Sequence, residues 1–290
     1  MTILVTGANG GLGKVLLPTL REKYKESVIG TGRDNAEYTD YLCCDLTDAS
    51  SVARLIKEVS PRIIFHLAGS FTGEFENDFR VNTLSAKHLF DSLLTENLDT
   101  RVVIFGSAAE YGAVEPEDNP IPETFPCRPV SVYGLTKSYQ TEMAAFYART
   151  TNLKIVIARI FNLAIHGLSQ RLFFGRAEAL IQSYKIGEIS QLVFGNLESV
   201  RDYIGLESTV DQLLDIANHG ISGEIYNVGS GVPKKMRTIL MERIDKEAIP
   251  YEAIVELSSE TVGRIGFDVP IIYADMTKTS RLKSVFAENT

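Results

Sequence analysis

The chain has 290 residues, of which 44% are hydrophobic and 23% charged. This composition is typical of a folded protein of one large or two ordinary domains, and it excludes disordered and low-complexity classes. The formal net charge of −8 disfavours nucleic acid as a partner, and no apolar run reaches the roughly 18 residues that a membrane helix needs. We therefore expect a cytoplasmic protein with no membrane partner.

Short apolar runs rich in β-branched residues alternate with amphipathic stretches in the first part of the chain. The runs predict strands at Ile3–Thr6, Val28–Thr31, Ile63–Leu67, Val102–Phe105 and Ile155–Ile160. Apolar residues recur every three or four positions between them, which predicts helices over Val15–Leu20, Val52–Val59, Leu84–Leu94 and Thr136–Tyr147. Because near-continuous apolar strands are buried on both faces, we predict an α/β fold with a Rossmann-type, doubly wound parallel sheet.

The alternation weakens after about residue 165. We assign residues 1–165 to a dinucleotide-binding Rossmann domain, which residues from about 203 to 228 rejoin. Residues 166–290 are then mostly a smaller, substrate-binding portion, because their segments are shorter and their loops richer in Gly and Pro.

A glycine-rich loop follows the first predicted strand. The segment TGANGGLG places Gly7, Gly10 and Gly13 between a strand and a helix. Gly7 allows a tight turn, Gly10 allows a pyrophosphate to approach the backbone, and Gly13 allows the helix to pack on the strand. Because the helix N-terminus faces the negative charge, the loop predicts a dinucleotide site, with an unliganded turn as the alternative.

The end of the second predicted strand bears on the choice between NADP and NAD. Thr31 and Arg33 supply a hydroxyl and a guanidinium, which suit a ribose 2′-phosphate better than a diol. We therefore favour NADP(H), while Asp34 keeps NAD(H) open because a carboxylate in this region binds the ribose diol. Asp45 either accepts a hydrogen bond from the adenine amino group or caps the next helix, as Asp48 also could.

A candidate catalytic set lies farther along the chain. Tyr133 and Lys137 lie one turn apart at a predicted helix start, so their side chains share a face. An ordinary tyrosine has a pKa of about 10, and a nearby ammonium is expected to lower the pKa of Tyr133 toward the range useful in acid–base catalysis. Ser107, at a strand end, is placed to bind the same substrate oxygen.

These motifs together resemble the extended short-chain dehydrogenase/reductase family, in its nucleotide-sugar branch. Within that branch the chain is most similar to GDP-6-deoxy-4-keto-mannose reductases. The matching segments, in order, are TGANGGLG, HLAG (His66–Gly69), Asn82 in VNT, GSAAEYG, YGLTK, RIFN (Arg159–Asn162), GNLESVRDY (Gly195–Tyr203) and YNVGSG (Tyr226–Gly231).

The resemblance implies hydride transfer from NADPH to the C4 ketone of a nucleotide-linked 4-keto-6-deoxyhexose. It makes Tyr133 the acid, Lys137 the group that binds the nicotinamide ribose and tunes Tyr133, and Ser107 the group that holds the C4 oxygen. Besides the residues already named, it places these around the cofactor: Asn9, Gly11, Leu12, Leu46, Leu67, Ala68, Gly69, Asn82 and Ile160. Around the substrate it places Ser107, Ala108, Asn162, Arg176 and Arg201.

Arg201 is the implied phosphate clamp, with a surface salt bridge to Asp202 as the alternative. Phe173 and Phe174 either line a nucleobase pocket or belong to the core.

Two departures from the family pattern bear on the reaction. Related 4,6-dehydratases carry an acid two positions before the tyrosine of the Tyr-Gly pair, where this chain has Ala109 and only the next residue, Glu110, is acidic. We therefore do not expect elimination. After RIFN the family usually has a Gly-Pro-Gly element, whereas this chain has Leu163–Gly167, which predicts a reshaped cleft beside the nicotinamide.

Two other functions stay open: an epimerase that retains NAD, and a cofactor-sensing protein without catalysis. The stretches Leu84–Leu94 and Thr136–Tyr147 resemble the helices that pair in family dimers, which predicts a homodimer, unless both stretches face only their own sheet. The four histidines show no spacing typical of metal ligands, so we expect no metal. Of these, His166 lies near the expected cleft.

Overall fold

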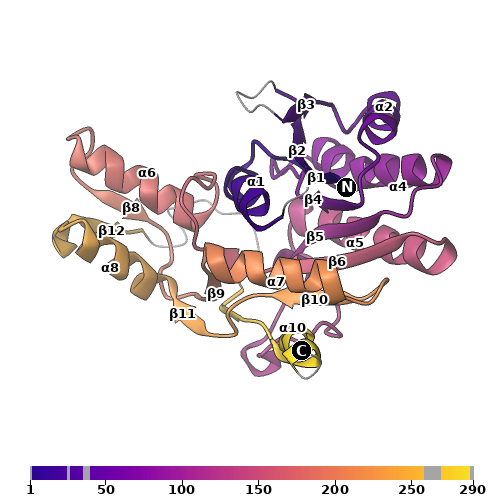
Figure 1. Cartoon of the computed structure of the whole chain (residues 1–290). Coiled ribbons are helices and arrows are strands. Elements are labelled where there is room, and N and C mark those ends of the chain that lie inside the picture. The colour runs from indigo at the N-terminus through magenta and orange to yellow at the C-terminus, as the bar shows by residue number, and fades with distance from the viewer. Residues whose placement is uncertain (1, 25–26, 35–39, 258–268, 288–290) are drawn as a thin grey trace.

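The computed structural model describes residues 2–24, 27–34, 40–257 and 269–287. Its centre is a seven-stranded sheet in the order β10-β6-β5-β4-β1-β2-β3 (Figure 1), and every neighbouring pair in it is parallel. The strands are β1 (Thr2–Thr6), β2 (Ser27–Gly32), β3 (Tyr41–Cys43), β4 (Ile63–His66), β5 (Arg101–Ser107), β6 (Lys154–Ile160) and β10 (Ile225–Val228). The predicted α/β fold with a doubly wound parallel sheet is confirmed, and each of the predicted apolar runs is a strand.

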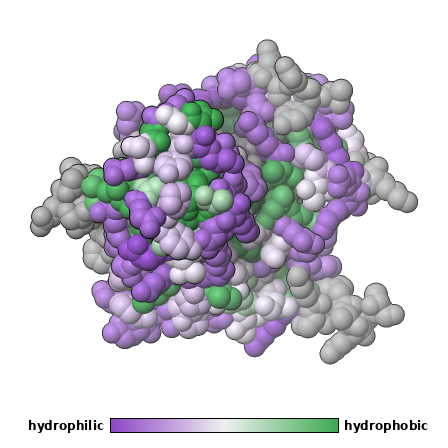
Figure 2. All heavy atoms as spheres, turned by 90° about the vertical axis from the view of Figure 1, so that its left-hand side faces the viewer, coloured by the Kyte–Doolittle hydropathy of each residue, from purple (hydrophilic) through white to green (hydrophobic). Residues whose placement is uncertain are grey.

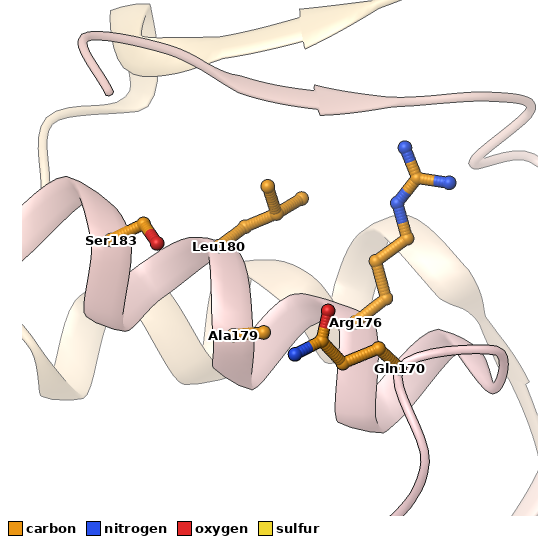
Figure 3. A pocket seen from close by; sticks show the side chains of 5 residues that line it. All are labelled: Gln170, Arg176, Ala179, Leu180 and Ser183. Carbon is orange, nitrogen blue, oxygen red and sulfur yellow. The ribbon is translucent and has the colours of Figure 1, made fainter. Parts of the chain in front are cut away.

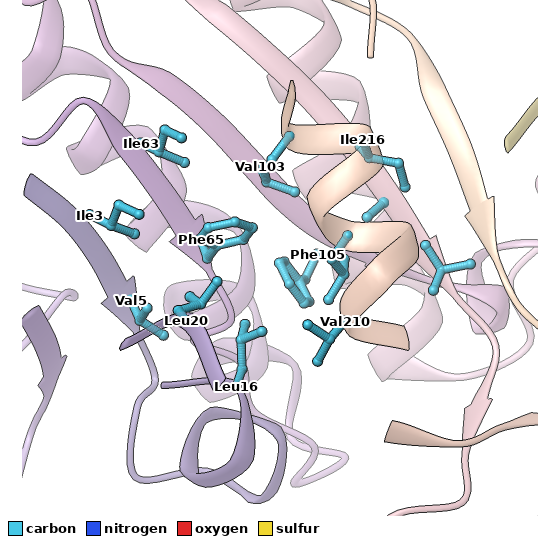
Figure 4. Packing of buried hydrophobic residues seen from close by; sticks show 14 of the residues in the cluster. Ile3, Val5, Leu16, Leu20, Ile63, Phe65, Val103, Phe105, Val210 and Ile216 are labelled. Atoms are coloured by element: carbon cyan, nitrogen blue, oxygen red, sulfur yellow. The ribbon is translucent and has the colours of Figure 1, made fainter. Parts of the chain in front are cut away.

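Helices cover both faces of this sheet, as its apolar strands require. On one face lie α1 (Gly11–Lys23) and α7 (Leu206–His219), which bury Leu16, Leu20, Val210 and Ile216 against the strands (Figure 4). The other face carries α2 (Ala49–Val59), α4 (Ser85–Thr95) and α5 (Val132–Thr150), which share a second apolar cluster. None of the helices in the described ranges has the length and hydropathy for crossing a bilayer.

A smaller region adjoins the sheet and comes from later parts of the chain. Its main sheet centres on β9 (Val200–Ile204), which pairs with β7 (Asn162–Leu163), β11 (Pro233–Lys235) and β13 (Ile271–Ile272). Beside it, β8 (Leu192–Phe194) and β12 (Ile254–Glu256) pair and share a small core with α6 (Phe173–Lys185) and α8 (Met236–Lys246). Figure 2 looks onto this end of the molecule, whose surface is mostly hydrophilic with scattered hydrophobic residues.

The remaining helical elements are short, apart from α10 (Thr277–Ala287), which packs on α7 and β10. Strand β10 lies in the second half of the chain and pairs with β6 at the edge of the main sheet. The other helices are α3 (Phe75–Phe79), the π-helix η1 (Arg80–Leu84) and the 3₁₀ turns η2 (Ala108–Glu110), η3 (Pro116–Asp118) and η4 (Tyr251–Ala253). Because the main-sheet strands are parallel, their carboxyl ends share one edge, where ligands bind in open α/β sheets.

Candidate active site

The glycine loop after β1 has the geometry of a phosphate cradle. Gly7 has a φ of +66°, a conformation that other residues rarely adopt. A Cβ on Gly13 would lie 2.4 Å from the Gly7 carbonyl oxygen, so the helix could not approach the strand with any larger residue there. Helix α1 begins at Gly11 after Gly10, and among the described residues no side chain caps its first turn. Its free N–H groups therefore fit the pyrophosphate of a dinucleotide.

The end of β2 separates the two residues expected to recognise the ribose. Thr31 is fully buried, and its hydroxyl donates a hydrogen bond to the Leu42 carbonyl at 2.7 Å. The hydroxyl proton of Thr31 is therefore used in a hydrogen bond within the sheet. Arg33 is exposed beyond the strand end, which leaves the guanidinium as the group suited to a 2′-phosphate. Nearby, the Asn9 amide donates to the Tyr41 hydroxyl at 2.8 Å, which ties the glycine loop to β3.

Asp45 and Asp48, after β3, differ in which of them caps the next helix. Asp48 caps α2 by accepting from the N–H groups of Ser50 and Ser51, and these bonds, with the hydroxyl bonds, lower its pKa to about 2. Asp45 instead accepts from Thr47 within a turn and is exposed, which leaves contact with adenine as a prediction. Its neighbour Leu46 is buried in the core beside α2.

The segment after β4 contains several of the residues predicted to lie around the cofactor. Leu67 and Gly69 line the cleft described below, and the Ala68 N–H donates to the Thr6 hydroxyl at 3.3 Å. Asn82 is fully buried in the π-helix η1, a kind of distortion that is frequent at functional sites. Its side chain accepts from the Ser70 N–H at 2.7 Å and donates to the Thr136 hydroxyl at 2.8 Å, which links this segment to α5.

The candidate catalytic residues meet in a cleft of about 820 Å³ between the carboxyl edge of the main sheet and the smaller region. Ser131 caps α5 by accepting from the Gly134 N–H at 3.0 Å, which places Tyr133 in the first turn and Lys137 in the second. Ser107 ends β5 opposite them, and all three line the cleft. Of the predicted cofactor and substrate residues, the cleft is also lined by Leu12, Leu67, Gly69, Ala108, Ile160, Asn162 and Arg201.

The direction of the Tyr133 pKa shift differs from the one expected. Burial raises the pKa of Tyr133 to about 12; a hydrogen bond with Ser107 opposes this, and the charges of Glu110 and Asp78 add to it. Lys137 donates to the Phe105 carbonyl and to Gln140, and its burial lowers its pKa to about 8. The expectation of a lowered phenol pKa is therefore wrong for this structure, because burial dominates the shift. At neutral pH the phenol keeps its proton.

Glu110 is committed to an internal ion pair beneath the cleft. Its carboxylate accepts from the Arg159 guanidinium at 2.8 and 3.1 Å, and the two side chains are 0% and 2% exposed. Its other oxygen accepts from the Ser107 N–H at 2.7 Å, which fixes the backbone that carries the catalytic serine. The Arg159 guanidinium also lies 4.6 Å from the centre of the Tyr111 ring. Glu110 is therefore a support for Ser107 and has no free oxygen aimed at a substrate.

The substrate side of the cleft is formed by β7, β9 and α6. Asn162 lines it and donates to the Asp202 carbonyl at 3.2 Å. Arg201 also lines it, and its guanidinium donates to the Val200 carbonyl at 2.9 Å. The Asp202 side chain is fully buried and accepts from the backbone of Ser230, Gly231 and Ala274. Asp202 thus holds the smaller sheet together. Phe173 and Phe174 line the cleft too.

Arg176 lies apart from the other predicted substrate residues. It lines a separate pocket of about 390 Å³ along α6, with Gln170 and Ser183 among its neighbours (Figure 3). Its guanidinium reaches toward β8 and donates to the Val193 carbonyl at 3.3 Å. The structure therefore does not bring Arg176 to the cleft. His166 is also outside the cleft lining; its ring pairs with Glu178 at 2.5 Å and its side chain is 82% exposed.

Sequence reasoning missed several lining residues of the described cleft. Ser70 and Phe71 follow the HLAG motif, and Leu168, Ser169 and Leu172 come from the segment before α6. The segment after HLAG is rich in Ser, Thr, Gly, Asp and Asn. This composition predicts an ordered loop and could have identified Ser70 and Phe71. Within the described ranges, no group of three or more His, Cys, Asp or Glu residues could hold a metal ion.

Comparison with known proteins places these features in a family context. The model of the NAD dependent epimerase/dehydratase family matches residues 3–229. GDP-6-deoxy-D-talose 4-dehydrogenase of Aggregatibacter actinomycetemcomitans is 30% identical over 236 residues, which cover 80% of this chain and 75% of that protein. GDP-6-deoxy-D-mannose reductase of Pseudomonas aeruginosa is 24% identical over 216 residues, covering 72% of this chain and 71% of that one.

Solved structures share the fold across different reactions. RMD from Pseudomonas aeruginosa, complexed with NADPH, superposes with a TM-score of 0.84 at 21% identity, covering 98% of this chain and 92% of that one. A UDP-glucose 4-epimerase from Thermotoga maritima, with UDP-glucose, gives 0.83 at 23% identity, covering 98% and 93%. At these identities the likeness shows the fold, and the reaction has to be argued from the site.

Proposed function

The chain belongs to the NAD dependent epimerase/dehydratase family, and from that premise we propose that it is an NADPH-dependent reductase of a nucleotide-linked 4-keto-6-deoxyhexose. The observation that carries the proposal is the meeting of Ser107, Tyr133 and Lys137 in one cleft next to the glycine loop. The names of the two relatives above, a 4-dehydrogenase and a reductase of GDP-6-deoxyhexoses, support the same substrate class.

The catalytic roles follow from the side-chain chemistry. A bound nicotinamide would supply the hydride that C4 receives. Tyr133 gives its phenol proton to the C4 oxygen, which becomes a hydroxyl, and a pKa raised to about 12 keeps that proton in place until the carbonyl becomes basic. Ser107 donates a hydrogen bond to the same oxygen, Lys137 would hold the nicotinamide ribose, and the Tyr133 phenolate regains its proton from solvent water. Arg201 pairs with the diphosphate of the sugar nucleotide.

The position of Glu110 favours reduction over elimination. A 4,6-dehydratase needs an acid that is free to assist the loss of water, and the Glu110 carboxylate is fully buried and bound to Arg159 and Ser107. Ala109, at the position where related dehydratases carry the acid, has no ionisable group.

We propose NADPH as the preferred reductant and residues 1–165, rejoined by β10, as the cofactor domain. The exposed guanidinium of Arg33 carries the preference, because it suits a 2′-phosphate.

We also propose a homodimer that pairs α4 and α5 with their copies. The inward stripe of α4 is used in the protein's own core, whereas α5 leaves Tyr139 43% and Phe146 53% exposed.

The test is a reductase assay with purified protein, NADPH and GDP-4-keto-6-deoxymannose, read from the absorbance of the reduced nicotinamide. We expect consumption of NADPH by the wild type and loss of turnover in Tyr133→Phe, while Arg176→Ala, outside the cleft, serves as the control. Tightly bound NAD with interconversion of C4 epimers and no net use of NADPH would favour the epimerase instead. Nucleotide binding without turnover of any sugar nucleotide would leave a cofactor-sensing protein.

A further inference from the structure

Phe71 lies beside the catalytic tyrosine, in the connection between β4 and α3. Its ring centre is 4.9 Å from that of Tyr133, with the two planes at 80°, an edge-to-face contact. The side chain lines the cleft and is 44% exposed. A large apolar ring that keeps this much exposed surface next to a reacting group has a face available for a ligand.

A buried carboxylate holds the backbone on both sides of Phe71. Asp78, which is fully buried, accepts from the Ser70 hydroxyl at 2.7 Å and from the Thr72 hydroxyl at 2.7 Å. It also accepts from the backbone N–H groups of Thr72 at 2.9 Å and Gly73 at 3.0 Å. Burial alone would raise the pKa of Asp78, but these hydrogen bonds lower it overall, so the group is an anion that the loop is wrapped around.

Two further contacts fix the same loop from other elements. The Asn82 side chain accepts from the Ser70 N–H at 2.7 Å, which anchors the start of the loop to η1. Arg171 donates to the Phe71 carbonyl from the segment that forms the opposite wall of the cleft. The loop is therefore held from three directions, although most of it is exposed, and the ring is kept in one place by the backbone that carries it.

We infer that Phe71 is a substrate-positioning residue whose ring packs against the apolar methyl group of the 6-deoxyhexose. The inference rests on the proposed function and deepens it. The methyl-bearing carbon C5 is bonded to C4, so a sugar whose C4 oxygen meets Tyr133 brings its methyl group close to the catalytic site. An apolar ring beside Tyr133 buries apolar surface when it packs against a methyl group. Against a hydroxymethyl group this gain is lost.

The test compares Phe71→Ala and Phe71→Leu with a matched control, Phe75→Ala. Phe75 is also exposed, at 39%, but it stacks on Phe79 and does not line the described cleft. In Phe71→Ala we expect the KM for the 4-keto-6-deoxy sugar nucleotide to rise about tenfold, since that is the loss expected for one partly buried aromatic contact. The KM for NADPH should stay as in the wild type, Phe71→Leu should recover most of the loss, and Phe75→Ala should match the wild type.

A calorimetric titration separates this inference from the reductase assignment. The wild type is expected to bind a GDP-6-deoxyhexose about tenfold more tightly than the corresponding GDP-hexose, and Phe71→Ala to bind the two equally. Equal preference in both proteins, or a rise only in the KM for NADPH, would overturn the inference while leaving the reductase in place. A wild type that binds the sugar nucleotides with this preference but never turns them over would refute the reductase and keep the role of Phe71.

The loop network gives a second, independent variant. Asp78→Asn places an amide where the loop's donors need an acceptor, and we expect it to raise the same KM as Phe71→Ala. Thr72→Val keeps the Asp78 carboxylate and removes the hydroxyl bond to it, together with the bonds that this hydroxyl accepts from the Glu74 N–H and the Asn77 amide. We expect a smaller change in the same direction, which covers the case in which Asp78→Asn does not fold. A folded Asp78→Asn variant with the wild-type KM would show that the position of the Phe71 ring does not depend on the hydrogen bonds of Asp78 to the loop.

Discussion

Glu110→Gln offers the sharpest stability test of the site. The substitution keeps the shape of the side chain and an oxygen for the Ser107 N–H, but it removes the charge opposite Arg159. The guanidinium is 2% exposed and donates two hydrogen bonds to the carboxylate, at 2.8 and 3.1 Å. Without its counter-charge, the guanidinium would keep the Tyr111 ring at 4.6 Å as a remaining attractive contact.

The expected loss of unfolding free energy is about 3–5 kcal/mol, the usual cost when one partner of a buried ion pair is removed. That is about a fifth or more of a total stability that is typically about 5–15 kcal/mol. Urea denaturation followed by circular dichroism measures it. Replacing both partners, as Glu110→Gln with Arg159→Met, removes both charges and should recover at least half of the loss, because a buried pair contributes little relative to apolar residues.

Two results would contradict the reasoning about Glu110. One is a loss below about 1 kcal/mol in Glu110→Gln, which would mean that Arg159 is not an uncompensated buried charge. The other is a Glu110→Gln protein that keeps its stability but has lost all turnover. That result would mean that the carboxyl group donates a proton during catalysis and contributes little to stability. That second outcome would return Glu110 to the role of an acid and reopen elimination as the reaction.

Three further predictions follow from other parts of the chain. Arg33→Ala should raise the KM for NADPH about tenfold or more and leave that for NADH unchanged in steady-state assays, because a charge-assisted hydrogen bond is lost; equal effects on both would remove the 2′-phosphate role. Phe146→Asp should give a monomeric mass by light scattering, and an unchanged dimer would place the interface elsewhere. Burial lowers the pKa of His66 to about 3, so its stability contribution is complete above about pH 6.5 and falls by about 1.4 kcal/mol per pH unit below it; acid unfolding of His66→Gln should lack this slope.

Local patterns were sufficient for five strands of the main sheet and for the set of Ser107, Tyr133 and Lys137. Apolar β-branched runs predict β1, β2, β4, β5 and β6 because a strand covered on both faces needs no alternation. The short β3 is not among the apolar runs, since a strand as brief as Tyr41–Cys43 has too few residues to show a period. Tyr133 and Lys137 were placed together because helical spacing alone brings them to one face.

Contacts between distant segments explain what the patterns did not predict. The position of Arg176 depends on how α6 packs on β8, and no local spacing encodes that packing. The Thr31 hydroxyl donates to a carbonyl of β3, and this pairing between two strands is not visible in the sequence of either one. The Glu110–Arg159 pair joins two residues far apart in sequence, and its burial becomes visible only when β5 and β6 lie side by side.

The pKa of Tyr133 shows why a catalytic motif does not by itself decide the reaction. Family members with different reactions share one fold, and a Ser, Tyr and Lys set can serve as acid or base according to its surroundings. Here burial keeps the phenol protonated, and an aromatic ring from the β4–α3 loop lies against it. We therefore expect the residues around this set to distinguish one reaction from another: Glu110, whose carboxylate is bound to Arg159, and Phe71, whose loop is held by Asp78. A change at Phe71 should alter which sugar is bound before it alters the fold of the sheet, whereas a change at Glu110 should lower the stability as well.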